Sequence, residues 1–205
     1  GGALGQVFLN LNNDFVYYYP DYVPSQWVLD LYTANDARYS AYFTTLQTGY
    51  AHALTFPLLT KYFGNESFLA NIIYHVSKPK PLRLAEQYLI RAEAYCEKGQ
   101  YGNANTDLAV LNQSRNGKAA VMNASNWREV ISDERVKELY MEGFRLHDLK
   151  RWNMGFERAH QSQAQPEGSR MKIEAGDYRF VWPIPQNDIE APGSEISQNN
   201  GYVSR

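Results

Sequence analysis

Two couples of glutamates could bring carboxylates together. They are Glu86 with Glu93 and Glu134 with Glu138. A glycosidase needs two carboxylates about 5 to 10 Å apart across a cleft, and one of them should lack a cationic partner. Each couple lies in helical patterning that accounts for its members as solvated or ion-paired residues. We therefore expect no catalytic residue, although a helical glycoside hydrolase is kept as an alternative.

Metal and thiol chemistry find little support. The histidines show no HxxxH or HExxH spacing and no carboxylate cluster beside them, so we expect no metal site. They are His52, His75, His147 and His160. The single cysteine, Cys96, lies on the apolar side of a predicted helix and is interpreted as a buried, inert thiol. The segment Gly99–Gly102 is better explained as an interhelical turn than as a phosphate loop, and no cofactor is expected.

An aromatic segment near the N-terminus offers binding chemistry. Its rings stand among prolines and could stack on the flat C–H faces of sugars, while phenol hydroxyls bond sugar hydroxyls. Alternatively, alternate rings such as Tyr17 and Tyr19 point into the core. The candidate ligand-binding residues are Tyr18, Tyr22 and Trp27.

Opposite charges recur three residues apart between Ile131 and Trp152. Exposed helical pairs of this kind contribute only about 0.3–0.5 kcal/mol each, whereas buried arginines can hold two backbone segments through bidentate hydrogen bonds. We favour a structural role over ligand binding, because carboxylates interleaved with arginines are already paired. The pairs are Arg135 with Glu138, Glu142 with Arg145, and Asp148 with Arg151.

These residues form a pattern that resembles the C-terminal signature of the SusD/RagB family. Asp36 and Arg38 after Leu31-Tyr32 repeat another family feature, and Asn200 departs from the usual proline near the C-terminus. The signature comprises Glu134, Arg135, Glu138, Leu139, Glu142, Gly143, Arg145, Asp148, Leu149, Arg151 and Trp152, followed by Trp182, Pro183, Ile184 and Pro185. So many matched positions at fixed offsets make the resemblance specific.

The resemblance implies a function. SusD/RagB proteins are surface-exposed outer-membrane lipoproteins that bind nutrients without catalysis and work with a SusC-like TonB-dependent transporter. The implied ligand is an oligosaccharide, or less favourably a peptide as for a RagB-like protein. The implied fold is mainly α, with a tetratricopeptide-like hairpin and a few short strands. Residues 1–205 would form the C-terminal part of such a domain.

The elements that position these residues follow from periodicity. A helix is predicted from Leu82 to Lys98 with Gly99 at its C′ position, and a second from about Gly102 to Ser114. The region 82–115 resembles a tetratricopeptide hairpin, which leaves a tetratricopeptide-type protein adaptor as an alternative function. The signature helices should occupy about 127–160, with Ser132 as an N-cap and a break at Gly143.

Shorter elements are expected elsewhere. Ser25 should cap a helix that ends near Ala34-Asn35, and Tyr39–Tyr62 should form an irregular hairpin or an extended segment. Strands are predicted at Val7–Leu11 and Tyr178–Trp182, and Ile72–Val76 should be a brief strand or a buried extended segment. Met154–His160 could extend the preceding helix.

Composition restricts the classes of partner. The chain has 20 Lys and Arg residues and 22 Asp and Glu residues, so it has no excess of positive charge. We therefore expect no nucleic-acid partner. No stretch approaches the ~20 apolar residues of a membrane span. The chain opens on Gly1-Gly2-Ala3 without a signal peptide, so a lipid anchor would lie upstream and is absent from this chain.

We predict that Arg145→Ala lowers the melting temperature and leaves ligand affinity per folded molecule intact, because the arginine is assigned to structure. Thermal unfolding and a binding titration on the same preparation test this. Unchanged stability with lost binding would overturn the assignment.

Overall fold

The computed structural model describes residues 8–9, 11–12, 17–49, 54–62, 80–158 and 172–202. The chain forms two compact units. The first comprises Gly1–Tyr140 with Gln161–Gln165, and the second comprises Met141–His160 with Pro166–Arg205. The predicted strand Ile72–Val76 lies outside the described residues.

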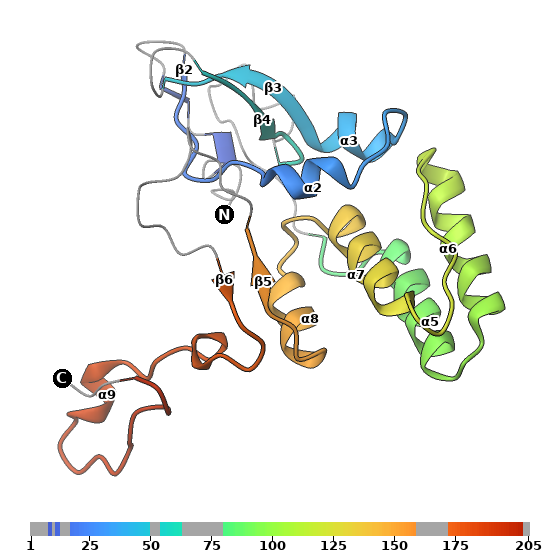
Figure 1. Cartoon of the computed structure of the whole chain (residues 1–205). Helices are drawn as coiled ribbons and strands as arrows, with labels where there is room; N and C mark the ends of the chain where they lie inside the picture. The colour runs from blue at the N-terminus through green and yellow to red at the C-terminus, as the bar shows by residue number, and fades with distance from the viewer. Residues whose placement is uncertain are drawn as a thin grey trace. The chain divides into compact units, whose positions relative to one another are not determined.

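Three helices lie side by side in the first unit (Figure 1). They are α5 (Leu84–Glu97), α6 (Tyr101–Arg115) and α7 (Trp127–Glu138), and α5 contacts both of the others. The two helices predicted between Leu82 and Ser114 are confirmed to within two residues at each end. Gly99 has φ +69 after the C-cap Lys98, as expected of a C′ glycine.

Small residues allow α5 and α6 to approach closely. Ala92 and Ala104 are both fully buried, and Cys96 is buried with its thiol 3.9 Å from Met122 Sδ. Burial raises the pKa of the Cys96 thiol, which keeps it protonated. The likeness of this hairpin to a tetratricopeptide unit stays a prediction.

The helix α7 begins at Trp127, where the first signature helix was expected, but its N-cap differs from the predicted one. Asn126 is its N-cap, and Ser132 is buried within it, so the prediction of Ser132 as N-cap is wrong. A polar turn fixes the start, because Asn126 Oδ1 accepts from the Asn123 amide and Trp127 N donates to Asn123 O. The apolar face of α7 already includes Val130 and Ile131, so the helix starts before Ser132.

The N-terminal part of the first unit packs two short helices with a hairpin. The helix α2 (Gln26–Asp30) begins after Ser25, whose side chain makes no capping bond, and ends before the predicted Ala34-Asn35. The hairpin expected within Tyr39–Tyr62 is confirmed. The remaining elements are α3 (Ala37–Tyr42), β3 (Phe43–Gln47) paired antiparallel with β4 (Thr55–Leu59), and β1 (Leu11–Asn12) paired with β2 (Tyr17–Tyr18).

A hydrophobic core joins these elements to α7. The core reaches Val136 of α7. Phe8 and Leu9 are also buried in it, and both are helical, so the strand predicted over Val7–Leu11 is wrong at these two residues. Its buried members are Phe8, Leu9, Val28, Leu29, Tyr32, Phe43, Leu58, Leu59 and Val136.

The second unit holds short elements. The prediction that Met154–His160 extends a helix is wrong, because Phe156 and Glu157 form a strand, and Gly155 lies where a Cβ would overlap the backbone of Ile173. The strand predicted at Tyr178–Trp182 is also wrong. The elements are α8 (Arg145–Arg151), β5 (Phe156–Glu157) paired with β6 (Lys172–Ile173), a 3-10 helix η1 (Tyr178–Phe180) and α9 (Gln186–Ile189).

We predict that Ala92→Leu costs about 1–3 kcal/mol of stability, because the added side chain must fit between packed backbones. Ala94→Leu, on the exposed side of the same helix, is the matched control and should change stability by no more than about 0.5 kcal/mol. Urea denaturation of both variants measures this. Equal effects would show that the α5–α6 contact is looser than described.

Candidate functional site

The signature carboxylates lie inside the first unit. Glu134 and Glu138 are one turn apart on α7 and are 1% and 0% exposed. Both face Arg38 of α3, whose Nη1 is 3.2 Å from Glu134 Oε2 and 3.4 Å from Glu138 Oε2. Lys137 also pairs with Glu134. Charged groups that leave water need such partners, because an unpaired buried charge is very costly.

Arg38 enters this cluster with a local partner. Asp36 is the N-cap of α3 and accepts a hydrogen bond from the Arg38 amide at 2.9 Å. The same carboxylate accepts from Arg38 Nε at 2.9 Å and from Nη2 at 2.7 Å. Asn112 of α6 accepts a further bond from Nη2. The Asp-x-Arg sequence therefore orients the guanidinium before distant segments meet it.

Glu138 joins two further arginines. Arg83, immediately before α5, places Nη1 3.0 Å from Glu138 Oε1, and Arg115, the last residue of α6, places Nη2 3.0 Å from the same oxygen. Arg115 Nε lies 3.2 Å from Oε2. Both ends of the α5–α6 hairpin are thus attached to one side chain of α7. We name this set of buried and half-buried charges, centred on Arg38, Glu134 and Glu138, the ionic cluster.

The end of α7 and the residues just after it are also held through their carbonyl groups. The last carbonyls of a helix lack partners within the helix. Tyr32 Oη donates to Lys137 O at 3.0 Å, Tyr42 Oη donates to Glu138 O at 3.1 Å, and Lys61 Nζ donates to Tyr140 O at 3.0 Å. Burial raises the pKa of Tyr32 above its usual range, so this hydroxyl remains a proton donor.

The protonation states in the ionic cluster follow from opposing effects. Burial alone would raise the pKa of Asp36 and Glu138. Hydrogen bonds from Arg38 to Asp36, and from Arg115 and Arg83 to Glu138, outweigh burial and hold both pKa values below the usual range. For Arg38, burial would lower the pKa, but the bonds to Asp36 and the charge of Glu134 raise it. Asp36, Arg38 and Glu138 are therefore charged at neutral pH.

This arrangement cannot perform glycoside hydrolysis at Glu134 and Glu138. Both carboxylates are buried and bound to cations, whereas the acid and the nucleophile must reach a substrate. Among the described residues, no group of His, Cys, Asp and Glu could hold a metal ion. Within the same ranges, no helix is long and apolar enough to cross a membrane.

The other signature residues are distributed differently. Arg135 is buried, Arg145 is half-buried, and Gly143 has φ +88. The expected pair of Asp148 with Arg151 is present at 2.9 Å, and the Arg151 guanidinium lies 4.0 Å from the centre of the Trp152 ring. Glu142 is half-buried, whereas Trp182, Pro183 and Pro185 are exposed.

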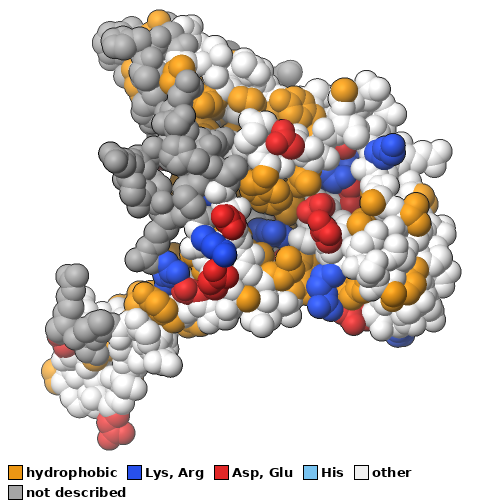
Figure 2. Space-filling model, viewed as in Figure 1, with side chains coloured by type: hydrophobic (Ala, Val, Ile, Leu, Met, Phe, Trp, Pro, Cys, Tyr) orange, Lys and Arg blue, Asp and Glu red, His pale blue; other side chains and the backbone are white. Residues whose placement is uncertain are grey.

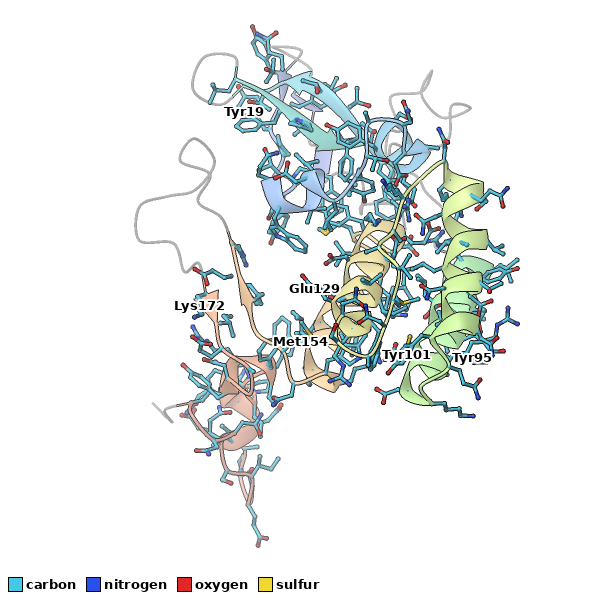
Figure 3. The ribbon with its side chains drawn as sticks, turned by 45° about the vertical axis from the view of Figure 1, so that its right-hand side comes forward. Tyr19, Tyr95, Tyr101, Glu129, Met154 and Lys172 are labelled. Atoms are coloured by element: carbon cyan, nitrogen blue, oxygen red, sulfur yellow. The ribbon has the colours of Figure 1, made fainter. Side chains whose placement is uncertain are left out.

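The candidate ligand-binding rings border the hydrophobic core of the first unit. Tyr18 and Trp27 are half-buried and pack against it, while Tyr22 is 61% exposed and its ring centre lies 6.5 Å from that of Phe8. Tyr19, labelled in Figure 3, covers Gly49, where a Cβ would overlap the ring. Of the three candidates, Tyr22 presents the most accessible ring, and their role in binding stays a prediction.

Sequence reasoning did not identify Arg83 and Arg115 as members of the ionic cluster. The expected partner of Glu138 was Arg135, three residues away. Arg83 lies 55 residues and Arg115 lies 23 residues from Glu138. The available signal was their position, because each stands at an end of the predicted α5–α6 hairpin.

We predict that Glu138→Gln costs about 3–5 kcal/mol at pH 7, because it leaves buried guanidinium charge without its counter-ion. Glu97→Gln is the matched control. It removes the exposed pair with Arg128 and should cost no more than about 1 kcal/mol.

The same variants test the pH dependence. Since the pKa values of Asp36 and Glu138 are lowered by folding, their stabilisation is present above about pH 4.3 and is lost as the pH falls further. Urea titrations between pH 7 and pH 3 should show a shallower loss in Glu138→Gln than in the unmodified protein. An identical slope would contradict the ionised cluster.

Comparisons with known proteins give a consistent result. The model of the SusD family matches residues 10–202. The starch-binding protein SusD of Bacteroides thetaiotaomicron is 36% identical over 120 residues, which cover 58% of this chain and 21% of that protein.

Solved structures are also similar. A putative sugar binding protein from Bacteroides vulgatus has a TM-score of 0.62 at 25% identity. The matched region covers 86% of this chain and 38% of that protein. A SusD superfamily protein from the same species has a TM-score of 0.59 at 28% identity. The matched region covers 82% of this chain and 36% of that protein. This chain therefore spans well under half of the length of these relatives. Because the family match extends over most of its residues, the chain belongs to the SusD family.

Proposed function

We propose that this chain is the C-terminal part of a SusD-like protein that binds a glycan without catalysis at the bacterial cell surface. The protein hands the glycan to a SusC-like TonB-dependent transporter. It is attached to the outer membrane through a lipid anchor. The family match over residues 10–202 carries the proposal.

The named relatives support the choice of ligand. One is a starch-binding protein and another is described as a putative sugar binding protein. On the face shown in Figure 2, Lys and Arg side chains are interspersed with Asp and Glu side chains. A surface of mixed charge suits a ligand that is recognised by stacking and hydroxyl contacts more than by its own charge.

The first unit supplies a ring for such contacts. Tyr22 is 61% exposed, and its aromatic neighbour Phe8 is fixed in the core. The phenol can stack against a sugar face and donate its hydroxyl hydrogen bond at the same time. Tyr18 and Trp27 pack against the same core as Phe8 and expose only part of their own surface.

Capture and release require no chemical step in this mechanism. Glu134 and Glu138 of α7 are bound within the ionic cluster and do not contact the ligand. The ligand is held by stacking and hydrogen bonds, which break when it is passed on. Affinity is therefore expected to be modest and to change little with pH while the fold is intact.

We predict that a titration of the intact protein against a glycan panel that includes malto-oligosaccharides detects saturable binding. Tyr22→Ala should weaken it about three- to tenfold, as expected for loss of one stacked ring. Leu82→Ala, which truncates an apolar side chain that is 79% exposed, is the control and should bind normally. Saturable hydrolysis of any glycan would contradict the proposal.

A further inference from the structure

The sequence contains two Asn-Gly pairs, Asn116-Gly117 and Asn200-Gly201. Asparagine before glycine is prone to deamidation, because glycine has no side chain to hinder attack by its backbone nitrogen. That nitrogen bonds to the asparagine Cγ, and the side-chain amide leaves as ammonia with the proton of the glycine N–H. Water then opens the cyclic imide at either carbonyl and gives aspartate or isoaspartate. Each reaction therefore replaces a neutral amide by a negative charge.

The backbone at the end of α6 holds Asn116 and Gly117 in a geometry that opposes this reaction. Asn116 is the C-cap and lies in the left-handed region, with φ 51 and ψ 27. Ring closure needs the glycine nitrogen and the asparagine Cβ to be nearly eclipsed about the Cα–C bond, whereas at this ψ the two atoms lie nearly opposite each other. The Gly117 N–H also donates to Asn112 O at 2.9 Å, a bond that closes the helix end. The attacking nitrogen is thus fixed away from its target.

Tertiary contacts hold the same corner of the chain. Asn116 Nδ2 donates to Asn35 O at 3.1 Å, so the side chain that must react is itself bound. Gly117 lies beside the ionic cluster, where an added Cβ would overlap polar side-chain atoms of three residues. These residues are Asp36, Arg38 and Asn112. Ring closure at Asn116 therefore requires the end of α6 to open and to leave the cluster.

The second pair lacks these restraints. Asn200 is exposed, and among the residues that the structure describes no hydrogen bond involves its side chain or the Gly201 N–H. Gly201 packs against the Tyr178 ring, which slows a backbone rearrangement but does not bind the nitrogen. This pair therefore serves as an internal reference for deamidation at the same pH and temperature.

The reaction products at Asn116 oppose re-formation of the closed corner. Either product replaces a donor by a carboxylate, which is an acceptor and cannot bond to Asn35 O. The new negative charge stands at the C-terminus of α6, where the last carbonyls already carry partial negative charge. Isoaspartate also lengthens the backbone before Gly117, which displaces this glycine from its position beside Arg38.

We propose that Asn116 is a latent deamidation site, which the closed end of α6 protects and which reacts when this end opens. Deamidation then prevents the contact with the ionic cluster from re-forming, so a reversible opening becomes a permanent loss of stability. Asn200, in contrast, reacts in the folded protein. The inference concerns the scaffold and holds whether or not the protein binds a glycan.

Peptide mapping by mass spectrometry tests the protection. The intact protein is incubated at mildly alkaline pH in buffer and in concentrated guanidinium chloride, and deamidation at Asn116 and Asn200 is followed in the same samples. In buffer Asn116 should react at least about tenfold more slowly than Asn200, and in denaturant the two rates should become similar. Similar rates in buffer, or a slow reaction at Asn116 in denaturant, would contradict the protection.

Three variants test the effect of the product on stability. Asn116→Asp should lower the melting temperature by about 2–4 °C, because it loses the bond to Asn35 and gains a charge at the helix end. Asn116→Gly removes the same donor without adding a charge and should lower the melting temperature less, because glycine suits the left-handed C-cap. Asn200→Asp adds the charge elsewhere and should leave the melting temperature unchanged. Equal effects of Asn116→Asp and Asn116→Gly would show that the carboxylate does no harm, and the proposed loss of stability would then be wrong.

Discussion

The ion pairing between Arg38 and the carboxylates of α7 is the constraint on which the first unit depends. These charges lie where water cannot reach them, and the cost of removing them from water is offset only when every partner is in place. Arg38 brings Asp36 with it, while Arg83 and Arg115 complete the environment of Glu138. Four separate stretches of chain must therefore occupy one arrangement, since a displaced segment leaves a buried charge uncompensated.

This constraint separates the parts of the chain by role. The most conspicuous acidic residues, Glu134 and Glu138, serve the architecture and are removed from any ligand. Aromatic rings are instead exposed on the surface of each unit, among them Tyr22 and Trp182. Such a division suits a protein that captures a ligand and releases it unchanged, because a fixed scaffold positions rings without offering an acid or a base.

Sequence reasoning succeeded where the determinants are local. The periodicity from Leu84 to Cys96 and the glycine at Gly99 were sufficient to place α5 and its end, and alternation within Tyr39–Tyr62 indicated the hairpin. It failed where a competing local interaction decides the conformation. Asp177 caps a 3-10 turn by accepting from the Arg179 amide at 2.9 Å, so a sequence rich in β-formers does not become a strand there.

The candidate site divides in the same way. Signature residues could be identified from their offsets, and Asp148 with Arg151 pairs as expected at short range. The partners of Glu138 could not be identified, because no periodicity relates it to Arg38, 100 residues away. The accessibility of a ring also depends on tertiary packing. Tyr18 and Trp27 are half-buried although they are as aromatic as Tyr22, and Trp182 is exposed although it belongs to the signature.

The wide separation of the arginines that meet Glu138 has a consequence for how the unit folds. Arg38, Arg83 and Arg115 lie 100, 55 and 23 residues from it, so the loops closed by these contacts differ greatly in length. Closing a longer loop costs more entropy before the contact stabilises the chain. The Arg115 contact therefore forms most readily, once α6 and α7 are adjacent, and Arg38 completes the cluster last. Burial of Glu134 and Glu138 before that contact forms would leave their charge without the Arg38 counter-ion, so the cost of an uncompensated buried charge favours burial only once Arg38 is in place.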